Sequence, residues 1–140
     1  MQISSRFTTA SHILVLLALE GEKEKQTSTS IAGSVGVNPV IIRNILSQLK
    51  EAGLVEVARG VGGARLAQGP DQITLLHVYQ AVELFGEKGQ LFAFHEQPNP
   101  SCQVVGRNIH PLLDSRLENA QSALENELAK TRLADLLAEL

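Results

Sequence analysis

The sequence predicts a mainly α-helical fold with one small β-hairpin. Apolar residues recur at helical spacing in several separate segments, and one pair of short segments flanks a glycine-rich turn in the way that two strands would. The composition agrees with this fold class. Hydrophobic residues make up 44% of the 140 residues but aromatic residues only 4%, a mix that favours packed helices over a β-sandwich.

The first two helices are expected in the N-terminal part of the chain. Apolar residues between Phe7 and Ala18 recur at i, i+3, i+4 and i+7, which predicts a helix within residues 4–20 with one buried face. A charged loop follows. Ser28 is then expected to cap a short helix over residues 29–35, because a serine hydroxyl can accept a hydrogen bond from a free N–H of the first turn.

The segment GVNP predicts a tight turn and the start of a third helix. Gly36 can adopt the positive φ that such a turn uses, Asn38 is a good N-cap, and Pro39 suits the first helical position, where its missing N–H needs no partner. The helix is expected to run to about Ala52 and to stop at Gly53. Its predicted buried stripe is Ile42, Ile45, Leu46 and Leu49.

A β-hairpin is expected after the third helix. Residues 54–58 and 64–68 read as two short strands, and the segment RGVGG lies between them. Glycines in that segment allow a thin hairpin tip. Residues 57–66 contain no acidic residue, although the whole chain has a net charge of -3.

The second half of the chain predicts three more helices. Thr74 is expected to cap a helix over residues 75–85. Thr131 is expected to cap a last short helix, which begins directly after Thr131. A long helix is expected between them, from Asn108 to about Ala129, with a stripe nearly as narrow as a coiled-coil seam. Such a helix needs something to pack on. The stripe consists of Ile109, Leu113, Leu117, Ala120, Leu124 and Leu128.

These elements divide the chain into three parts. Residues 1–85 are expected to form one helical domain with the hairpin, and residues 86–107 an irregular connection interrupted by glycines and prolines. Residues 108–140 hold the long helix and the last short helix. One domain of common size can bury an ordinary core.

Charge and cysteine content limit the classes of function. Residues 1–66 hold seven basic and five acidic residues, whereas the remainder holds five basic and ten acidic residues, so a polyanionic partner would meet the first half. The longest apolar run, Ile13 to Leu19, is too short to cross a bilayer, which predicts no membrane partner. A single cysteine and the absence of a signal-peptide pattern fit a cytoplasmic location.

Two helices joined by a tight turn and followed by a two-stranded hairpin with basic residues are the layout of a winged helix-turn-helix domain. An α-helix fits the major groove of DNA when one side holds it to its domain and the other side is short, polar or cationic. Arg43 can pair with guanine and Asn44 with adenine. The free side of the third helix is expected to present Asn38, Pro39, Val40, Ile41, Arg43, Asn44 and Ser47.

The hairpin and two helix starts add candidate contacts to the DNA backbone. Gly62 and Gly63 keep the wing thin, so that Arg59 or Arg65 can reach a minor groove. Ser4, Ser5, Arg6 and Thr8 at the first helix, and Ser28 and Thr29 at the second, are candidates for phosphate contacts. Two alternatives stay open: a winged helix that docks a protein, and one that binds a small molecule without reading DNA.

The chain resembles the Rrf family of bacterial winged-helix transcriptional regulators, which includes IscR, NsrR and CymR, and above all its YwnA-like members. Arg6, SIAGSVGVNPVIIRNILSQLKEAGLV, RGVGGARLA and ITLLHVYQAVE carry this resemblance over nearly the whole chain. It implies a homodimer joined by the long helix and a palindromic operator, usually with repression as the outcome. It also implies DNA reading by the start of the third helix and by the wing, with Arg6 near phosphates.

The chain departs from the cluster-binding members of that family in its cysteines. Those members carry three cysteines before the dimer helix, and here Cys102 stands alone. An iron–sulfur cluster takes about four protein ligands, so we expect no cluster and no metal. A strained cluster shared by two subunits with help from His95 or His110 stays open as an alternative. Cys102 has two interpretations: a semi-buried structural residue, or a thiol sensor activated by Arg107 or a helix N-terminus.

No enzyme is expected, because the chain has no P-loop and no nucleophile beside a base in a recognisable motif. The leading hypothesis is a homodimeric transcriptional repressor that binds double-stranded DNA. Two recognition helices about 34–36 Å apart would read successive major grooves. An effector that shifts the dimer helices would change that spacing and release the DNA.

Overall fold

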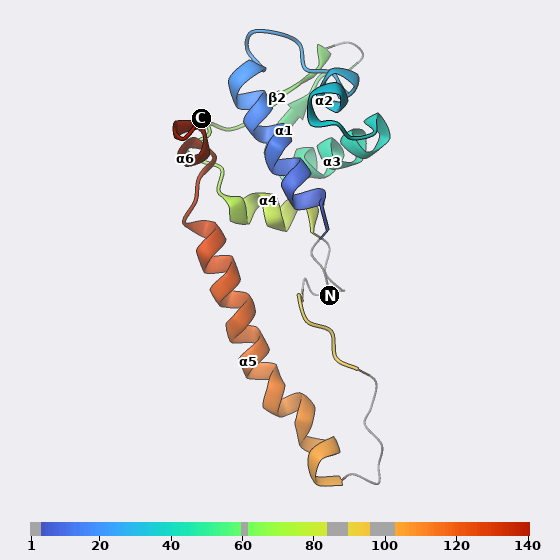
Figure 1. Cartoon of the computed structure of the whole chain (residues 1–140), viewed down its shortest axis with the longest axis vertical. Helices are drawn as coiled ribbons and strands as arrows, with labels where there is room; N and C mark the ends of the chain where they lie inside the picture. The colour runs from blue at the N-terminus through green and yellow to red at the C-terminus, as the bar shows by residue number, and fades with distance from the viewer. Residues whose placement is uncertain (1–3, 60–61, 84–89, 96–102) are drawn as a thin grey trace. The chain divides into compact units, whose positions relative to one another are not determined.

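The structure is a computed structural model that describes residues 4–59, 62–83, 90–95 and 103–140. Within these residues the chain forms six α-helices and one antiparallel two-stranded sheet, so the predicted fold class is confirmed (Figure 1). The elements are α1 (Arg6–Glu20), α2 (Ser28–Val35), α3 (Pro39–Glu51), β1 (Val55–Val57), β2 (Ala64–Leu66), α4 (Leu75–Val82), α5 (Gln103–Ala129) and α6 (Leu133–Ala138).

The chain divides into two compact units. One unit is Met1–Glu83 together with Leu128–Leu140, and the other is Leu84–Glu127. The boundaries expected from the sequence grouped α6 with the long helix, whereas α6 packs in the first unit. Leu133 is buried there, and its backbone N–H donates to the carbonyl of Ile73 over 2.7 Å.

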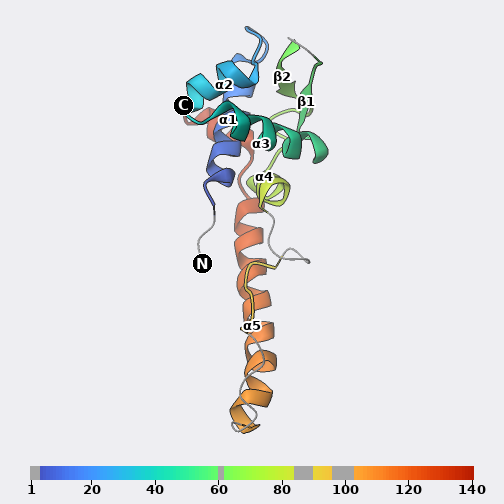
Figure 2. The ribbon, with the colours of Figure 1, turned by 90° about the vertical axis from the view of Figure 1, so that its right-hand side faces the viewer.

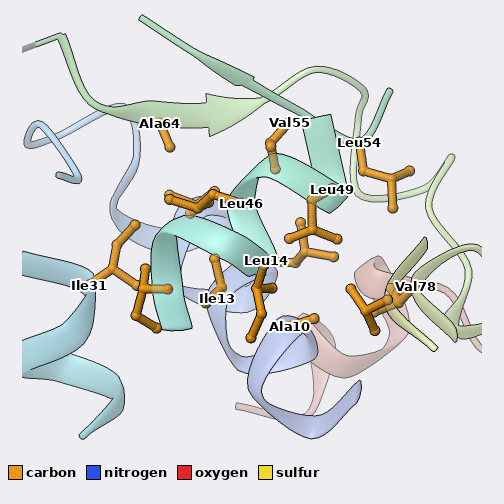
Figure 3. Close-up of a cluster of buried hydrophobic side chains, with 14 of the residues drawn as sticks. Ala10, Ile13, Leu14, Ile31, Leu46, Leu49, Leu54, Val55, Ala64 and Val78 are labelled. Carbon is orange, nitrogen blue, oxygen red and sulfur yellow. The ribbon is translucent and has the colours of Figure 1, made fainter. Parts of the chain in front are cut away.

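Aliphatic side chains from the helices and the hairpin form the core of the first unit (Figure 3). The predicted buried faces of α1 and α3 are confirmed at their most buried residues. In α1 the buried residues are Ala10, Ile13, Leu14 and Leu17, and in α3 they are Ile42, Ile45, Leu46 and Leu49. This packing fixes which side of α3 is left to solvent.

The helix starts show where local rules succeed and where they miss by one residue. Thr74 caps α4 as predicted, and His77 completes a capping box with it. The cap of α2 is Thr27 rather than Ser28, because the extended backbone at Thr27 lets its hydroxyl accept from the N–H of Ser30 over 3.1 Å. The cap of α6 is Arg132 rather than Thr131.

The hairpin is shorter than expected and has a third contact that the sequence did not indicate. Its antiparallel register pairs Val55 with Leu66, Glu56 with Arg65, and Val57 with Ala64. Ala64 also bridges Gln26 in the loop before α2, and donates its N–H to the Gln26 carbonyl over 2.8 Å. The hairpin also packs against α3 through β1 (Figure 2).

The long helix begins earlier than predicted. It starts at Gln103 rather than at Asn108, and it continues through Gly106 and Pro111. Gly106 looked like the end of the irregular connection, because glycine costs about 1 kcal/mol in a helix. Here Asn108 lies inside the helix and donates its side-chain amide to the Val104 carbonyl over 2.6 Å. None of the helices in the described residues combines the length and the apolar character needed to span a bilayer.

Candidate nucleic-acid interface

The turn between α2 and α3 is built as the sequence predicts. Gly36 ends α2 with a φ of 78°, in the left-handed region that favours glycine. The Asn38 side chain accepts a hydrogen bond from the N–H of Val40 over 2.8 Å, and Pro39 occupies the first turn of α3. These local interactions set the direction in which α3 leaves the turn.

The solvent side of α3 carries the residues proposed to read DNA. Apart from Pro39, which is half-buried, this set is exposed: Asn38, Val40, Ile41, Arg43, Asn44 and Ser47. Val40 is 55% exposed and Ile41 is 42% exposed. Two neighbouring aliphatic side chains in water favour a partner that covers them, because burial of apolar surface stabilises a complex.

Arg43 is held by a residue from another helix. Its Nε donates to the Ser28 hydroxyl at the start of α2 over 3.3 Å. This contact leaves the two terminal nitrogens of the guanidinium for the forked hydrogen bonds that a guanine edge accepts. Thr29, the other candidate at this helix start, is exposed.

Arg6 also contacts α3. One of its terminal nitrogens donates to the side-chain oxygen of Gln48, a residue 42 positions away in the chain. Arg6 is half-buried, so part of its side chain serves the packing of α1 on α3. The Gln48 contact was not indicated by the sequence.

A groove of about 420 Å³ connects α2, α3 and the hairpin. It brings together residues that lie far apart in the chain, so candidate contacts of α2 and α3 share one surface with Gly63 of the wing. Its lining includes Ser28, Arg43, Ser47, Lys50 and Gly63.

The wing approaches the rest of its unit at Gly63. This glycine has a φ of 75°, and a Cβ built on it would lie 3.0 Å from the carbonyl oxygen of Gln26. Both the backbone conformation and the lack of room for a Cβ therefore favour glycine at position 63. Gly62 and Arg59 are exposed, and within the described part of the chain Arg59 has no ion-pair partner. Residues 60 and 61 lie outside the described residues.

Arg65 is not a free cation. Its Nε donates to the Glu56 carboxylate over 2.9 Å across the hairpin. Glu56 lies one position before the acid-free segment 57–66, so a count along the sequence hides the pair that the antiparallel register creates.

The predicted stripe of α5 is only partly covered by the described residues of the single chain. Ile109, Leu117, Leu124 and Leu128 are half-buried, and Leu113 and Ala120 are exposed. Val105 at 59% exposure and Leu112 at 56% widen the apolar face, although neither was part of the predicted stripe. A helix with so many exposed aliphatic side chains favours packing against a partner.

Residues 90–95 pack along α5. The N–H of Leu91 donates to the Gln121 side chain over 3.0 Å, and the rings of His95 and His110 meet edge to face at 4.9 Å. The sensor hypothesis for Cys102 falls on a residue outside the described ones. Among the described residues, no group of three or more His, Cys, Asp or Glu side chains could hold a metal ion.

The exposed recognition helix and the basic wing define a winged helix-turn-helix of the DNA-binding class. A family model, Rrf2, described as "Iron-dependent Transcriptional regulator", matches residues 3–139. The chain therefore belongs to the Rrf2 family of transcriptional regulators, which confirms the resemblance seen in its motifs, and such regulators are not enzymes.

Similar proteins support the same assignment. "Putative HTH-type transcriptional regulator YwnA" of Bacillus subtilis (strain 168) is 44% identical over 138 residues, which cover 99% of this chain and 98% of YwnA. A crystal structure of "a putative DNA binding protein" is 38% identical with a TM-score of 0.76, and the match covers 95% of this chain and 99% of that one. "T. potens IscR" shares the fold, with a TM-score of 0.71 at 22% identity over 99% of this chain and 88% of its own.

The family description names iron, and the sequence of this chain offers few thiolate donors for an iron–sulfur cluster. Cys102 is the only cysteine, and His95 and His110 are the nearest ring donors to it along the sequence. Iron–sulfur clusters are held by about four ligands, mostly thiolates. One thiolate per chain does not supply that set.

Proposed function

We propose that this chain is a homodimeric, sequence-specific DNA-binding regulator that represses transcription by occupying a palindromic operator. The strongest support for this proposal is the difference between the two sides of α3. One side of the helix is buried in the core, and the other side presents cationic, amide and aliphatic groups to solvent. A major groove accepts a helix with this division.

Each exposed group on α3 matches a feature of base edges. Arg43 can donate two parallel hydrogen bonds to guanine O6 and N7, and Asn44 can bond adenine N6 and N7, with each good pair worth about 1–3 kcal/mol of discrimination. Val40 or Ile41 can contact the methyl group of thymine. Ser28 orients Arg43 through the 3.3 Å hydrogen bond, so the base-reading side chain is partly positioned before DNA arrives.

The remaining candidates contact the DNA backbone in this proposal. Arg59, exposed and without an ion-pair partner among the described residues, enters the minor groove at the thin wing. Ser28, Thr29 and Ser47 lie close to the sugar–phosphate backbone that borders the groove. Arg6 contributes a weaker phosphate contact, because one of its nitrogens is already bonded to Gln48.

Dimerisation multiplies the discrimination of one short helix. The apolar face of α5 pairs with that of a second copy in this proposal, and the two α3 helices then read half-sites about one helical turn apart. An effector that alters the pairing would lower operator affinity. Cys102 is one candidate for that response, as a thiol sensor. We propose that the regulator works without an iron–sulfur cluster.

Salt-dependent binding tests the function directly. The wild-type chain is titrated onto duplex DNA at several salt concentrations, beside Arg43→Ala and Arg59→Ala. We expect the affinity of the wild type to fall steeply with salt, and both variants to bind more weakly. Arg116→Ala is the matched control, because Arg116 is an exposed arginine of α5 that is not among the candidate DNA contacts.

A winged helix that serves as a protein-docking module gives another result in the same experiment. In that case neither the wild type nor the arginine variants bind duplex DNA, and the exposed Val40 and Ile41 serve a protein partner instead.

A further inference from the structure

The wing carries a single acidic residue, and its carboxylate faces an arginine. Residues 54–68 contain Glu56, Arg59 and Arg65 as their only charged groups. The register places Glu56 directly opposite Arg65, with 2.9 Å between the Arg65 Nε and a carboxylate oxygen. Of the two wing arginines, Arg59 alone has no such partner among the described residues.

The pair lies on the outer face of the hairpin. Side chains alternate between the two faces of a strand, and Val55 and Ala64 are buried on the inner face. Ala64 and Val57 also line the groove that contains Arg43. Glu56 and Arg65 therefore project from the opposite face, where their side chains are 56% and 75% exposed.

We propose that Glu56 neutralises Arg65 and so limits the sequence-independent affinity of the wing for DNA. The inference rests on the proposed DNA-binding function and concerns the balance between its two kinds of contact. Phosphate contacts raise affinity for every sequence alike, whereas base contacts raise it for the operator only. Removing one cation from the phosphate-binding set increases the share carried by Arg43 and Asn44.

Neutralisation does not depend on a strong ion pair. An exposed pair of this kind contributes little to stability, since water and salt screen it. Its charges still cancel for a distant phosphate, and if Arg65 turned toward DNA, Glu56 would be left near the polyanion. The wing thus meets DNA with the net charge of Arg59 alone.

Quantitative DNA binding by Glu56→Gln tests the proposal. Glutamine keeps the shape of the side chain and removes its charge, so Arg65 becomes available to phosphate. On a random-sequence duplex we expect the slope of log affinity against log salt to steepen by about 0.9 for each wing that contacts DNA. The affinity should rise by about eightfold per wing at 0.1 M salt, which is the same slope evaluated at that concentration.

Three further variants show whether the gain comes from Arg65. Arg65→Gln alone should bind more weakly than the wild type, because it leaves the charge of Glu56 uncompensated near DNA. Glu56→Gln with Arg65→Gln should lose the gain and bind as the wild type does. The exchanged pair Glu56→Arg with Arg65→Glu restores neutrality and should also return to wild-type values. Circular dichroism and thermal unfolding check that each variant is folded. The comparison of the double variant with the wild type keeps the test valid if Glu56→Gln alone misfolds.

Duplexes that the wild type selects from a random pool provide the specificity measurement. For Glu56→Gln, the affinities for selected DNA and for random DNA should rise by about the same factor, because a phosphate contact does not depend on sequence. If Glu56→Gln with Arg65→Gln bound random DNA more weakly than the wild type, Arg65 would contact DNA directly in the wild type, and the inference would be overturned. An unchanged salt slope for Glu56→Gln would overturn it too.

These outcomes are separate from failure of the proposed function. If the wild type binds DNA and the charge variants bind identically, the role of Glu56 is wrong and DNA binding stands. If no variant binds DNA at any salt concentration, the proposed function itself is wrong, and this inference is wrong with it.

Discussion

At the scale of single residues, Asn38 shows how a residue chosen for a candidate site can serve the fold first. Its side-chain oxygen accepts from the N–H of Val40 and caps α3. The cap does not use its amide nitrogen, which lies at the exposed start of the helix. The same side chain can therefore orient the recognition helix and contact DNA.

Removal of the Asn38 cap should destabilise the protein. We expect Asn38→Ala to lower the free energy of unfolding in urea by about 1 kcal/mol, because one N–H of the first turn loses its partner. Asn44→Ala is the matched control, since Asn44 is an exposed asparagine of the same helix without a capping role. It should change stability by less than about 0.5 kcal/mol. Equal losses in both variants would contradict the cap as the cause.

Gly36 and Gly63 form a second matched pair. Both have positive φ, but only Gly63 has backbone atoms of Gln26 close to where a Cβ would stand. Gly36→Ala should cost about 1 kcal/mol through conformation alone, and Gly63→Ala should cost more because the hairpin must also move away from Gln26. Urea unfolding of both variants measures the difference in free energy of unfolding. If Gly63→Ala is the milder change, the close approach of Gln26 does not constrain position 63.

Residue types were predictable from the sequence, whereas their long-range partners were not. The turn signals Gly36, Asn38 and Pro39 act within a few positions, so local rules locate them. The contacts of Arg6 with Gln48 and of Glu56 with Arg65 depend on how helices pack and on strand register. A short stretch of sequence specifies neither the packing of helices nor the register of strands.

At the scale of elements, periodicity predicts the buried face of a helix better than its ends. The stripe of α3 was predicted residue by residue, because its four positions must all face one core. The predicted start of α5, at Asn108, is too late, because Gly106 is locally poor in a helix. Packing and neighbouring contacts can outweigh such local costs.

The start of α6 predicts a pH effect. The pKa of Asp135 is lowered by hydrogen bonds from the Arg132 side chain and from the Arg132 backbone N–H. A carboxylate whose pKa is lowered in the folded state stabilises that state above its ordinary value of 3.8, and this contribution is lost as pH falls through the folded-state pKa. Asp135→Asn should thus be less stable than the wild type at neutral pH.

Unfolding curves of both proteins from neutral pH into the acid range check this sign. The difference in free energy of unfolding should shrink toward zero as Asp135 of the wild type becomes protonated. A difference that stays constant down to pH values well below 3.8 would show that the ion pair with Arg132 does not cause it.

At the scale of the whole molecule, charge and apolar surface are divided between the parts of the chain. The basic excess lies in residues 1–66, where the recognition helix and wing are, and the acidic excess lies in the remainder. The largest run of exposed aliphatic side chains within the described residues belongs to α5. We expect the first to meet DNA and the second to meet another copy of the chain.

A charge placed in the α5 stripe should separate the proposed dimer. Leu117→Glu puts a carboxylate among the apolar positions, and sedimentation should then report a mass near 15.1 kDa, that of one chain, rather than twice this value. Ser122→Glu adds the same charge on the opposite side of α5 and should leave the dimer intact. If both variants stay dimeric, the stripe is not the interface.

In the proposed function, the chain binds DNA as a two-fold symmetric dimer, and α3 of each subunit reads bases. The most direct test of this claim is selection of bound duplexes from random DNA by the wild type and by Arg43→Ala. We predict that the wild type enriches an inverted repeat with half-site centres about 10–10.5 base pairs apart, and that Arg43→Ala loses the preference for one guanine in each half-site. Enrichment of no sequence, or of the same sequence by both proteins, would contradict the claim.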